Sequence, residues 1–128
     1  MTKSNGDKQV TMKKITKEPS HDCKMAIMAV HDAIDVLNGK WKITIITCLL
    51  FGPRRYSDIM RDVKGISGKV LSRELKEMET NLLISRSVIS NRPITVSYSL
   101  TDYGMSVQPI ITVLSEWGQT HRKQISKK

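Results

Sequence analysis

Basic side chains gather in the middle of the chain, at a spacing that suits contacts with an anionic partner. Residues 54–92 contain nine of them against five acids: Arg54, Arg55, Arg61, Lys64, Lys69, Arg73, Lys76, Arg86 and Arg92. Lys69 and Arg73 lie four residues apart, so a helix would place both on one face, with Ser72 and Lys76 beside them. The arginine fork pairs with guanine O6 and N7 or with a phosphate, whereas lysines contact phosphates as point charges. This face is a candidate contact for nucleic acid.

The same residues permit a plainer interpretation, in which they form only the solvated face of an amphipathic helix. Three acids, Glu74, Glu77 and Glu79, are interleaved with the cations and can pair with Lys or Arg at helical spacing. What favours binding is the combination of this face with a tight turn before it and a basic hairpin after it.

Residue types that carry catalysis or bind metals show no recognisable arrangement. The histidines, His21, His31 and His121, have no cysteine or carboxylate partners at the spacing of a metal site or a catalytic triad. The chain also lacks a glycine-rich phosphate loop and a nucleophile elbow. We therefore expect no enzyme, no metal and no cofactor.

Length and charge bound the domain organisation. With 128 residues the chain is long enough for one hydrophobic core. Most of its formal net charge of +9 lies at the ends, with +3 in residues 1–20 and +4 in residues 122–128. We expect a flexible basic arm over 1–22, one domain over 23–121 and a basic tail over 122–128.

The apolar pattern bears on the compartment. The longest apolar stretch, residues 43–51, is shorter than the roughly 18–20 residues that cross a bilayer. The first residues lack the apolar segment of a secretory signal. We expect a cytoplasmic protein without membrane contact, in which Cys23 and Cys48 stay reduced.

Apolar residues recur at helical spacing in the first two thirds of the chain and predict helices over 24–37, 40–50, 56–63 and 67–82. Asn38-Gly39 supplies a left-handed stop, and Asn81 is expected to play that part after the fourth helix. The second helix is apolar nearly all round, so we expect it to be buried, with Trp41 filling the core and Cys48 as inert packing.

The period then changes from helix to strand. Alternating Val96, Tyr98 and Leu100 predict a strand whose hairpin partner is 84–89, with 90–93 as the loop. Thr101-Asp102 begins a last helix whose apolar stripe reaches Trp117.

This order of elements predicts a mainly α fold with a small β-hairpin, a winged helix-turn-helix. Residues 63–66 form the short glycine-containing turn between the third and fourth helices, and the fourth, from Ser67 to Met78, can lie in a major groove. Arg92 at the hairpin tip can enter a minor groove or touch the backbone.

Several motifs, in this order and spacing, resemble those of the HxlR-type regulators, whose architecture is related to the MarR type. They are Asn-Gly-Lys-Trp at 38–41, Gly-Pro-Arg-Arg-Tyr-Ser-Asp-Ile at 52–59, Gly-Ile-Ser at 65–67, Leu-Ser-Arg-Glu-Leu-Lys-Glu-Met-Glu at 71–79, Tyr-Ser-Leu-Thr-Asp-Tyr-Gly at 98–104 and Glu-Trp at 116–117. The resemblance covers about residues 23–118 and implies a dimeric bacterial transcription factor.

The resemblance also assigns the DNA-contacting residues. The helix that reads an operator half-site would contribute Ser67, Gly68, Lys69, Ser72, Arg73 and Lys76. Contacts to the DNA backbone and from the wing would come from Arg54, Arg55, Tyr56 and Arg92.

The terminal helices would form the dimer, because their apolar stripes are too extensive for outer helices exposed to water. The expected interface residues are Ile27, Val30, Ile34, Val107, Ile111, Leu114 and Trp117. The alternative is ordinary core packing within one chain.

Cys23 stands where some members of this family carry a cysteine that senses oxidants or electrophiles, so it is a candidate redox sensor. No residue pattern identifies an effector.

The sequence therefore predicts a homodimeric, sequence-specific regulator of transcription that binds double-stranded DNA at an inverted-repeat operator, with repression as the expected outcome. The alternative is a winged-helix module that binds protein or RNA without reading a DNA sequence, because fold alone does not fix the partner.

Overall fold

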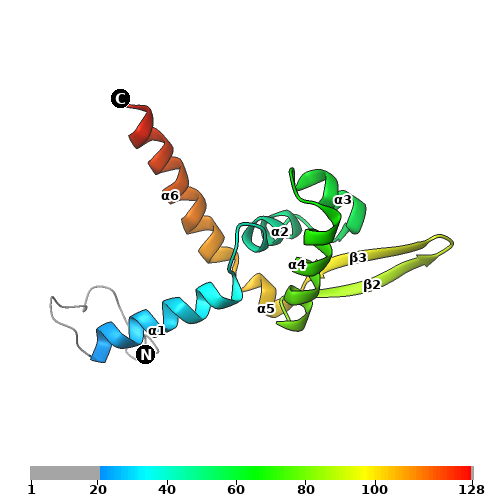
Figure 1. Cartoon of the computed structure of the whole chain (residues 1–128), viewed down its shortest axis with the longest axis horizontal. Helices are drawn as coiled ribbons and strands as arrows, with labels where there is room; N and C mark the ends of the chain where they lie inside the picture. The colour runs from blue at the N-terminus through cyan, green and yellow to red at the C-terminus, as the bar shows by residue number, and fades with distance from the viewer. Residues whose placement is uncertain (1–20, 128) are drawn as a thin grey trace. The chain divides into compact units, whose positions relative to one another are not determined.

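The computed structural model describes residues 21–127. These fall into two units, one ending at Asn38 and the other beginning at Gly39. The first unit contains α1 (His21–Val36), and the second contains all the other elements (Figure 1). Residues 1–20 of the predicted arm lie outside the described part of the chain, whereas His21 and Asp22 are already helical.

α1 is an amphipathic helix that begins earlier than its apolar stripe predicted. Asp22 lies in the first turn, where a negative charge complements the helix dipole. Gly39 has a φ of 77° and provides the predicted left-handed stop.

α2 (Lys42–Leu49) buries Ile45, Ile46 and Leu49. The predicted burial of this helix is confirmed for these three side chains. Trp41 does not fill the core: it is half-buried before the helix, with the Lys40 ammonium 4.6 Å from its ring centroid.

α3 (Tyr56–Asp62) and α4 (Gly68–Thr80) form the helix-turn-helix. Gly65 in the turn has a φ of 90°, which favours glycine. Ser67 caps α4 as predicted, because its Oγ accepts a hydrogen bond from the Val70 amide at 3.2 Å. The turn and cap set the direction in which α4 leaves α3.

The end of α4 differs from the prediction, because Leu82 and not Asn81 takes the left-handed conformation, with a φ of 64°. The amides of Leu82 and Leu83 donate to the carbonyls of Glu79 and Met78 at 3.0 and 2.9 Å, which is the Schellman pattern. These bonds, together with the burial of Leu83, outweigh the cost of about 1–2 kcal/mol for a left-handed non-glycine residue.

The wing is a three-stranded antiparallel sheet in the order β1-β3-β2, formed by β1 (Arg54–Arg55), β2 (Ile84–Asn91) and β3 (Ile94–Leu100). The hairpin is longer than predicted, since only Arg92 and Pro93 separate its strands, and the peptide bond between them is cis. β1 was not predicted, because two residues are too few to show a strand period.

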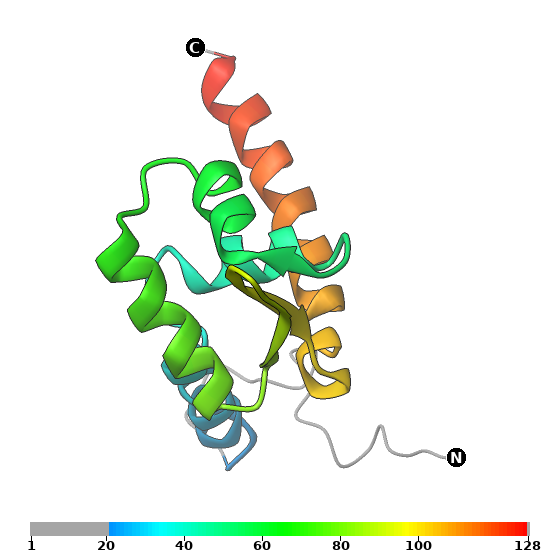
Figure 2. The same ribbon diagram turned by 90° about the vertical axis from the view of Figure 1, so that its right-hand side faces the viewer.

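The predicted last helix is two helices, α5 (Asp102–Met105) and α6 (Gln108–Ser126). Pro109 has no amide to donate to the preceding turn, so it favours a new helix start at this point. Residues 122–126, expected as a tail, are the last turns of α6. The second half of α6 extends beyond the other elements of its unit (Figure 2).

The core of the second unit lies between α2, α3, α4, the sheet and the start of α6. Its buried apolar residues are Ile45, Ile46, Leu49, Ile59, Val63, Ile66, Leu71, Leu75, Met78, Leu83, Ile84, Tyr98, Val107 and Ile111. Among the described residues, no helix has the length and apolar character needed to cross a membrane.

Candidate nucleic-acid interface

The outer face of α4 brings together the residues predicted for the recognition helix. Leu71, Leu75 and Met78 point into the core. The opposite side presents the predicted set, of which Gly68 is half-buried and the rest are exposed: Ser67, Gly68, Lys69, Ser72, Arg73 and Lys76. A groove about 12 Å wide admits one helix with such a face.

Tyr56 connects α3 to the start of α4. Its hydroxyl donates to the Gly68 carbonyl at 3.0 Å and lies 3.1 Å from Ser72 Oγ. Since a tyrosine has one hydroxyl proton, Ser72 is the donor in the second bond. Ser72 is thereby left with acceptor lone pairs at the exposed face, which suit an amino group on a base edge.

Lys42 reaches α4 from the buried side. Its ammonium lies 2.5 Å from Glu74 Oε1 and 2.7 Å from Glu77 Oε1. Burial alone would lower the pKa of Lys42, but hydrogen bonds and attraction from the two carboxylates outweigh it and raise this pKa above its usual value. The role of Lys42 was not predicted from the sequence, although a charge among the apolar residues of α2 was its visible sign.

Arg73 projects from α4 with a side chain that is 57% exposed. One guanidinium nitrogen donates to Glu74 Oε2 at 3.1 Å. Glu74 is itself buried, which by itself raises its pKa, yet hydrogen bonds from Lys42 and Arg73 lower that pKa overall. Glu74 therefore pairs with the adjacent Arg73 and with Lys42 on α2, and among the described residues it has no ion pair at the helical spacing that was expected.

A polar cleft of about 340 Å³ lies between α4 and the hairpin, lined by Ser72, Lys76, Glu79, Arg86 and Tyr98. Arg86 on β2 is directly opposite Tyr98 on β3, so both side chains lie on the sheet face that meets α4. The cleft is lined by two cations and two hydroxyl-bearing side chains against one carboxylate. Arg86 was missed as a site residue because its charge was visible but its position opposite α4 was not.

The remaining predicted DNA contacts are spread over the wing and β1. Arg92 is exposed at the hairpin tip. Arg55 is exposed, and its amide donates to Asp58 Oδ2 at 3.4 Å at the start of α3. Arg54 is half-buried and lines a different cavity, so the structure does not bring it to the α4 face.

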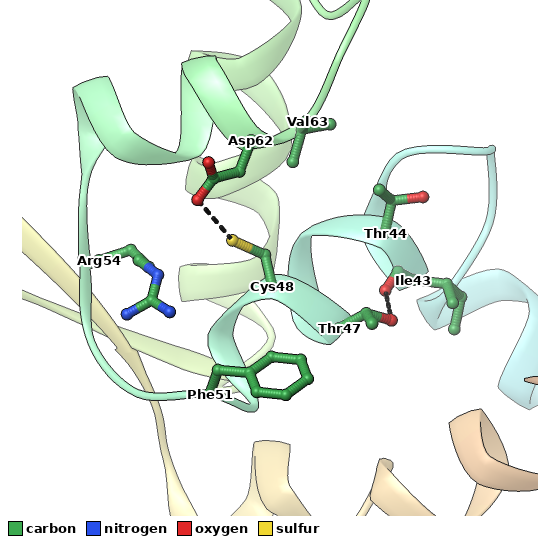
Figure 3. Close-up of a pocket in the computed structure, with 8 residues that line it drawn as sticks. All are labelled: Ile43, Thr44, Thr47, Cys48, Phe51, Arg54, Asp62 and Val63. Atoms are coloured by element: carbon green, nitrogen blue, oxygen red, sulfur yellow. Dashed lines mark hydrogen bonds between the residues drawn. The ribbon is translucent and has the colours of Figure 1, made fainter.

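That second cavity has a volume of about 430 Å³ and lies between α2, α3 and β1 (Figure 3). It is lined by Ile43, Thr44, Thr47, Cys48, Phe51, Arg54, Asp62 and Val63. Cys48 is half-buried here, with Sγ 4.0 Å from Asp62 Oδ2, so it lines this cavity and is not packed inside the core as expected. Burial and the Asp62 charge raise the pKa of its thiol.

The residues predicted for a dimer interface divide into two groups. Ile27, Val30 and Ile34 on α1 and Leu114 and Trp117 on α6 are all at least 50% exposed. Val107 and Ile111, by contrast, are only 6% and 9% exposed. They belong to the core of their own unit, so their assignment to the interface was wrong.

Two further apolar side chains on α6 add to its exposed face. Ile110 and Val113 are 45% and 64% exposed, and neither was among the residues predicted for the interface. Trp117 stacks on His121 at a ring-centroid distance of 5.2 Å.

Cys23, the candidate redox sensor, lies half-buried near the start of α1. Within residues 21–127, no group of three or more His, Cys, Asp or Glu residues is placed to hold a metal ion.

Known proteins are similar to this chain in sequence and in architecture. The model of the family described as HxlR-like helix-turn-helix matches residues 36–126. A relative from Bacillus subtilis (strain 168), the uncharacterized HTH-type transcriptional regulator YvaP, is 40% identical over 85 residues, which cover 66% of this chain and 79% of YvaP.

Solved structures agree. The HTH-type transcriptional regulator YtcD, also from B. subtilis, superposes with a TM-score of 0.70 at 35% identity, covering 73% of this chain and 96% of that chain. The redox regulator HypR in its reduced form gives a TM-score of 0.73 at 30% identity, covering 78% of this chain and 99% of that chain. The chain belongs to the HxlR-like helix-turn-helix family and is a winged-helix, DNA-binding regulator of transcription.

Proposed function

We propose that this regulator binds an inverted-repeat operator as a homodimer, with α4 of each subunit in a major groove, and that binding represses transcription. The observation that carries this proposal is the outer face of α4, where Lys69, Arg73 and Lys76 are exposed directly opposite the buried face of the same helix.

The cations have different roles in this proposal. Arg73 is fixed near the middle of α4 and has the fork geometry for guanine O6 and N7, so it reads a base. Lys69 and Lys76 contact phosphates, as do Arg55 and, at the wing tip, Arg92. Arg86 and Lys76 together bind a phosphate in the cleft between α4 and the hairpin. Tyr56 acts mainly by holding the start of α4.

The dimer rests on apolar side chains that water would otherwise surround. α1 exposes Ile27, Val30 and Ile34, and α6 exposes Leu114 and Trp117. Covering these two faces with a second copy removes apolar area from water. Two-fold symmetry of the dimer then matches an inverted repeat.

Cys23 is the proposed redox-sensing residue. Support comes from relatives: HypR is described as a redox regulator and was solved in oxidized and reduced forms, and YodB was solved after diamide treatment. Diamide should lower operator affinity of the wild-type protein and leave Cys23→Ser unaffected. Equal affinity of both proteins with and without diamide would remove this role.

The remaining parts of the proposal are that the protein is not an enzyme and that it acts in the cytoplasm. Membership of a family of transcriptional regulators supports a protein without catalytic activity that acts in the cytoplasm.

A DNA-selection experiment distinguishes this proposal from the alternative, a winged-helix module that binds protein or RNA. Selection from random duplexes at about 150 mM salt, where non-specific binding is suppressed, should enrich one operator sequence. On that operator Arg73→Ala should cost about 1–3 kcal/mol and relax discrimination at one base pair, whereas Lys76→Ala should weaken all sequences alike. Equal losses for both variants on operator and random DNA would contradict these roles, and no enrichment would favour the alternative.

A further inference from the structure

Lys42 carries a charge inside the protein, where it cannot contact DNA, so DNA binding does not by itself explain this residue. Its side chain is 3% exposed, on a helix whose neighbours Ile45, Ile46 and Leu49 form the core. Charged side chains are almost never buried to this extent unless they are paired. Its partners lie on α4, the helix that carries the DNA-contacting face.

Glu74 joins this buried charge to the exposed face. One carboxylate oxygen accepts from Lys42 at 2.5 Å, and the other accepts from Arg73 at 3.1 Å. The side chain of Glu74 is 9% exposed, so its bond with Lys42 is buried, whereas its bond with Arg73, whose side chain is 57% exposed, is partly buried. A continuous chain of contacts therefore runs from α2, through Glu74, to the guanidinium at the proposed DNA surface.

Stability alone does not account for such an arrangement. Replacing a buried ion pair with apolar residues of similar volume is often neutral or stabilising, because desolvation of the charges offsets their attraction. What apolar residues cannot do is hold a guanidinium in one orientation. Glu77 differs from Glu74, since among the ion pairs of the described residues it pairs with Lys42 and not with Arg73.

We infer that Lys42 and Glu74 are positioning residues for sequence readout: Lys42 fixes the Glu74 carboxylate, which orients the Arg73 guanidinium before DNA arrives. This inference rests on the proposed role of Arg73 in reading a base. An arginine that is already ordered loses less conformational freedom on binding. Random DNA, contacted mainly through phosphates, does not require that orientation, so the gain appears as discrimination between operator and random duplex.

The test uses the full chain and a double variant, Lys42→Met with Glu74→Met, which removes both buried charges together. Since pre-ordering one side chain is worth about a few-fold to tenfold in affinity, the ratio of operator to random affinity should fall about three- to tenfold. Affinity for random duplex should change less than twofold, as should both affinities in the matched control Glu77→Gln. Thermal unfolding checks that each variant is folded.

A double-mutant cycle locates the effect on Arg73. Arg73→Ala should cost less operator affinity in the double variant than in the wild type, because part of its contribution is already lost. A folded double variant with the wild-type ratio, or an undiminished effect of Arg73→Ala in that background, would overturn the inference. If Arg73→Ala alone leaves the ratio of operator to random affinity unchanged, Arg73 does not read a base, and it is the proposed function that is contradicted.

A second measurement covers the case in which the double variant does not fold. Glu74→Gln keeps the shape of the side chain, and NMR of the arginine side-chain nitrogens reports directly on guanidinium order. In the wild type the Arg73 guanidinium should show restricted rotation, which Glu74→Gln should release and Glu77→Gln should not. Free rotation of Arg73 in the wild type would overturn the inference without any DNA measurement.

Discussion

At the scale of single residues, Arg86 is the cation whose role depends most on the folded structure. It faces Lys76 across the cleft between α4 and the hairpin. We predict that Arg86→Ala weakens binding to operator and random duplex alike. The plot of log affinity against log salt should become less steep, with the magnitude of its negative slope smaller by about 0.9, the value for one lost phosphate contact. Titrations at several salt concentrations measure this slope.

Lys123→Ala is the matched control for Arg86. It removes one charge from the last turn of α6, outside the cleft, and should leave the slope unchanged. A loss confined to one base pair in Arg86→Ala would show that this residue reads sequence, which contradicts the phosphate role.

Cys48 is a residue whose reactivity depends on its surroundings in the folded protein. Burial and Asp62 raise the pKa of the Cys48 thiol, so little thiolate is present at neutral pH. In a Cys23→Ser background, alkylation of Cys48 at pH about 7 should be slower than alkylation of an unperturbed thiol of pKa about 8.5. Asp62→Asn should speed it, because one of the causes is removed, whereas equal rates for both proteins would contradict the effect of Asp62.

At the scale of elements, the contact between α2 and α4 makes folding sensitive to acid. The pKa of Glu74 is lowered in the folded protein, so its stabilisation is present above the ordinary carboxyl value and is lost as pH falls through the lowered one. We predict that, between pH about 5 and 3, the free energy of unfolding falls more steeply for wild type than for the Lys42→Met, Glu74→Met variant.

Denaturant titrations across this range measure the difference between the two proteins. The comparison reports on the Lys42 cluster as a whole, because Glu77 also loses its Lys42 partner in the variant. Parallel pH profiles would contradict a lowered Glu74 pKa.

Most elements were predictable because their signals are local. The stripes of α3 and α4, the cap at Ser67 and the turn at Gly65 follow from neighbours in sequence. The two-residue β1 is different, since it exists only because it pairs with β3, with Arg54 opposite Tyr98. Likewise Leu82 adopts a left-handed conformation because burying Leu83 fixes the turn, which residue preference alone assigns to Asn81.

The site shows the same division. The exposed side of α4 follows from helical spacing, so its DNA-contacting residues could be named without a structure. Lys42, Glu74 and Arg86 could not, because their roles depend on contacts between elements distant in sequence. The burial of Val107 and Ile111 is also tertiary: one apolar stripe on α6 serves the core at its start and is exposed further along.

At the scale of the whole molecule, the exposed apolar face of α6 predicts self-association. Trp117 is 65% exposed, so Trp117→Ser should change thermal stability of the isolated subunit little. We predict that it shifts the protein from dimer toward monomer in sedimentation velocity and lowers operator affinity, since one subunit binds only one half-site. Gln119→Ser, an exposed polar position on the same helix, should remain dimeric. Wild-type protein that sediments as a monomer would contradict the proposed dimer.

The central claim is that two copies of α4 read one specific DNA sequence. The measurement that tests it most directly is a DNase footprint of the wild-type protein on DNA upstream of its own gene, at about 150 mM salt. A dimer with α4 of each subunit in a major groove should protect an inverted repeat whose half-sites lie about one helical turn, or a multiple of it, apart. Absence of protection there, with equal affinity for the sequence enriched by selection and for random duplex, would contradict the central claim.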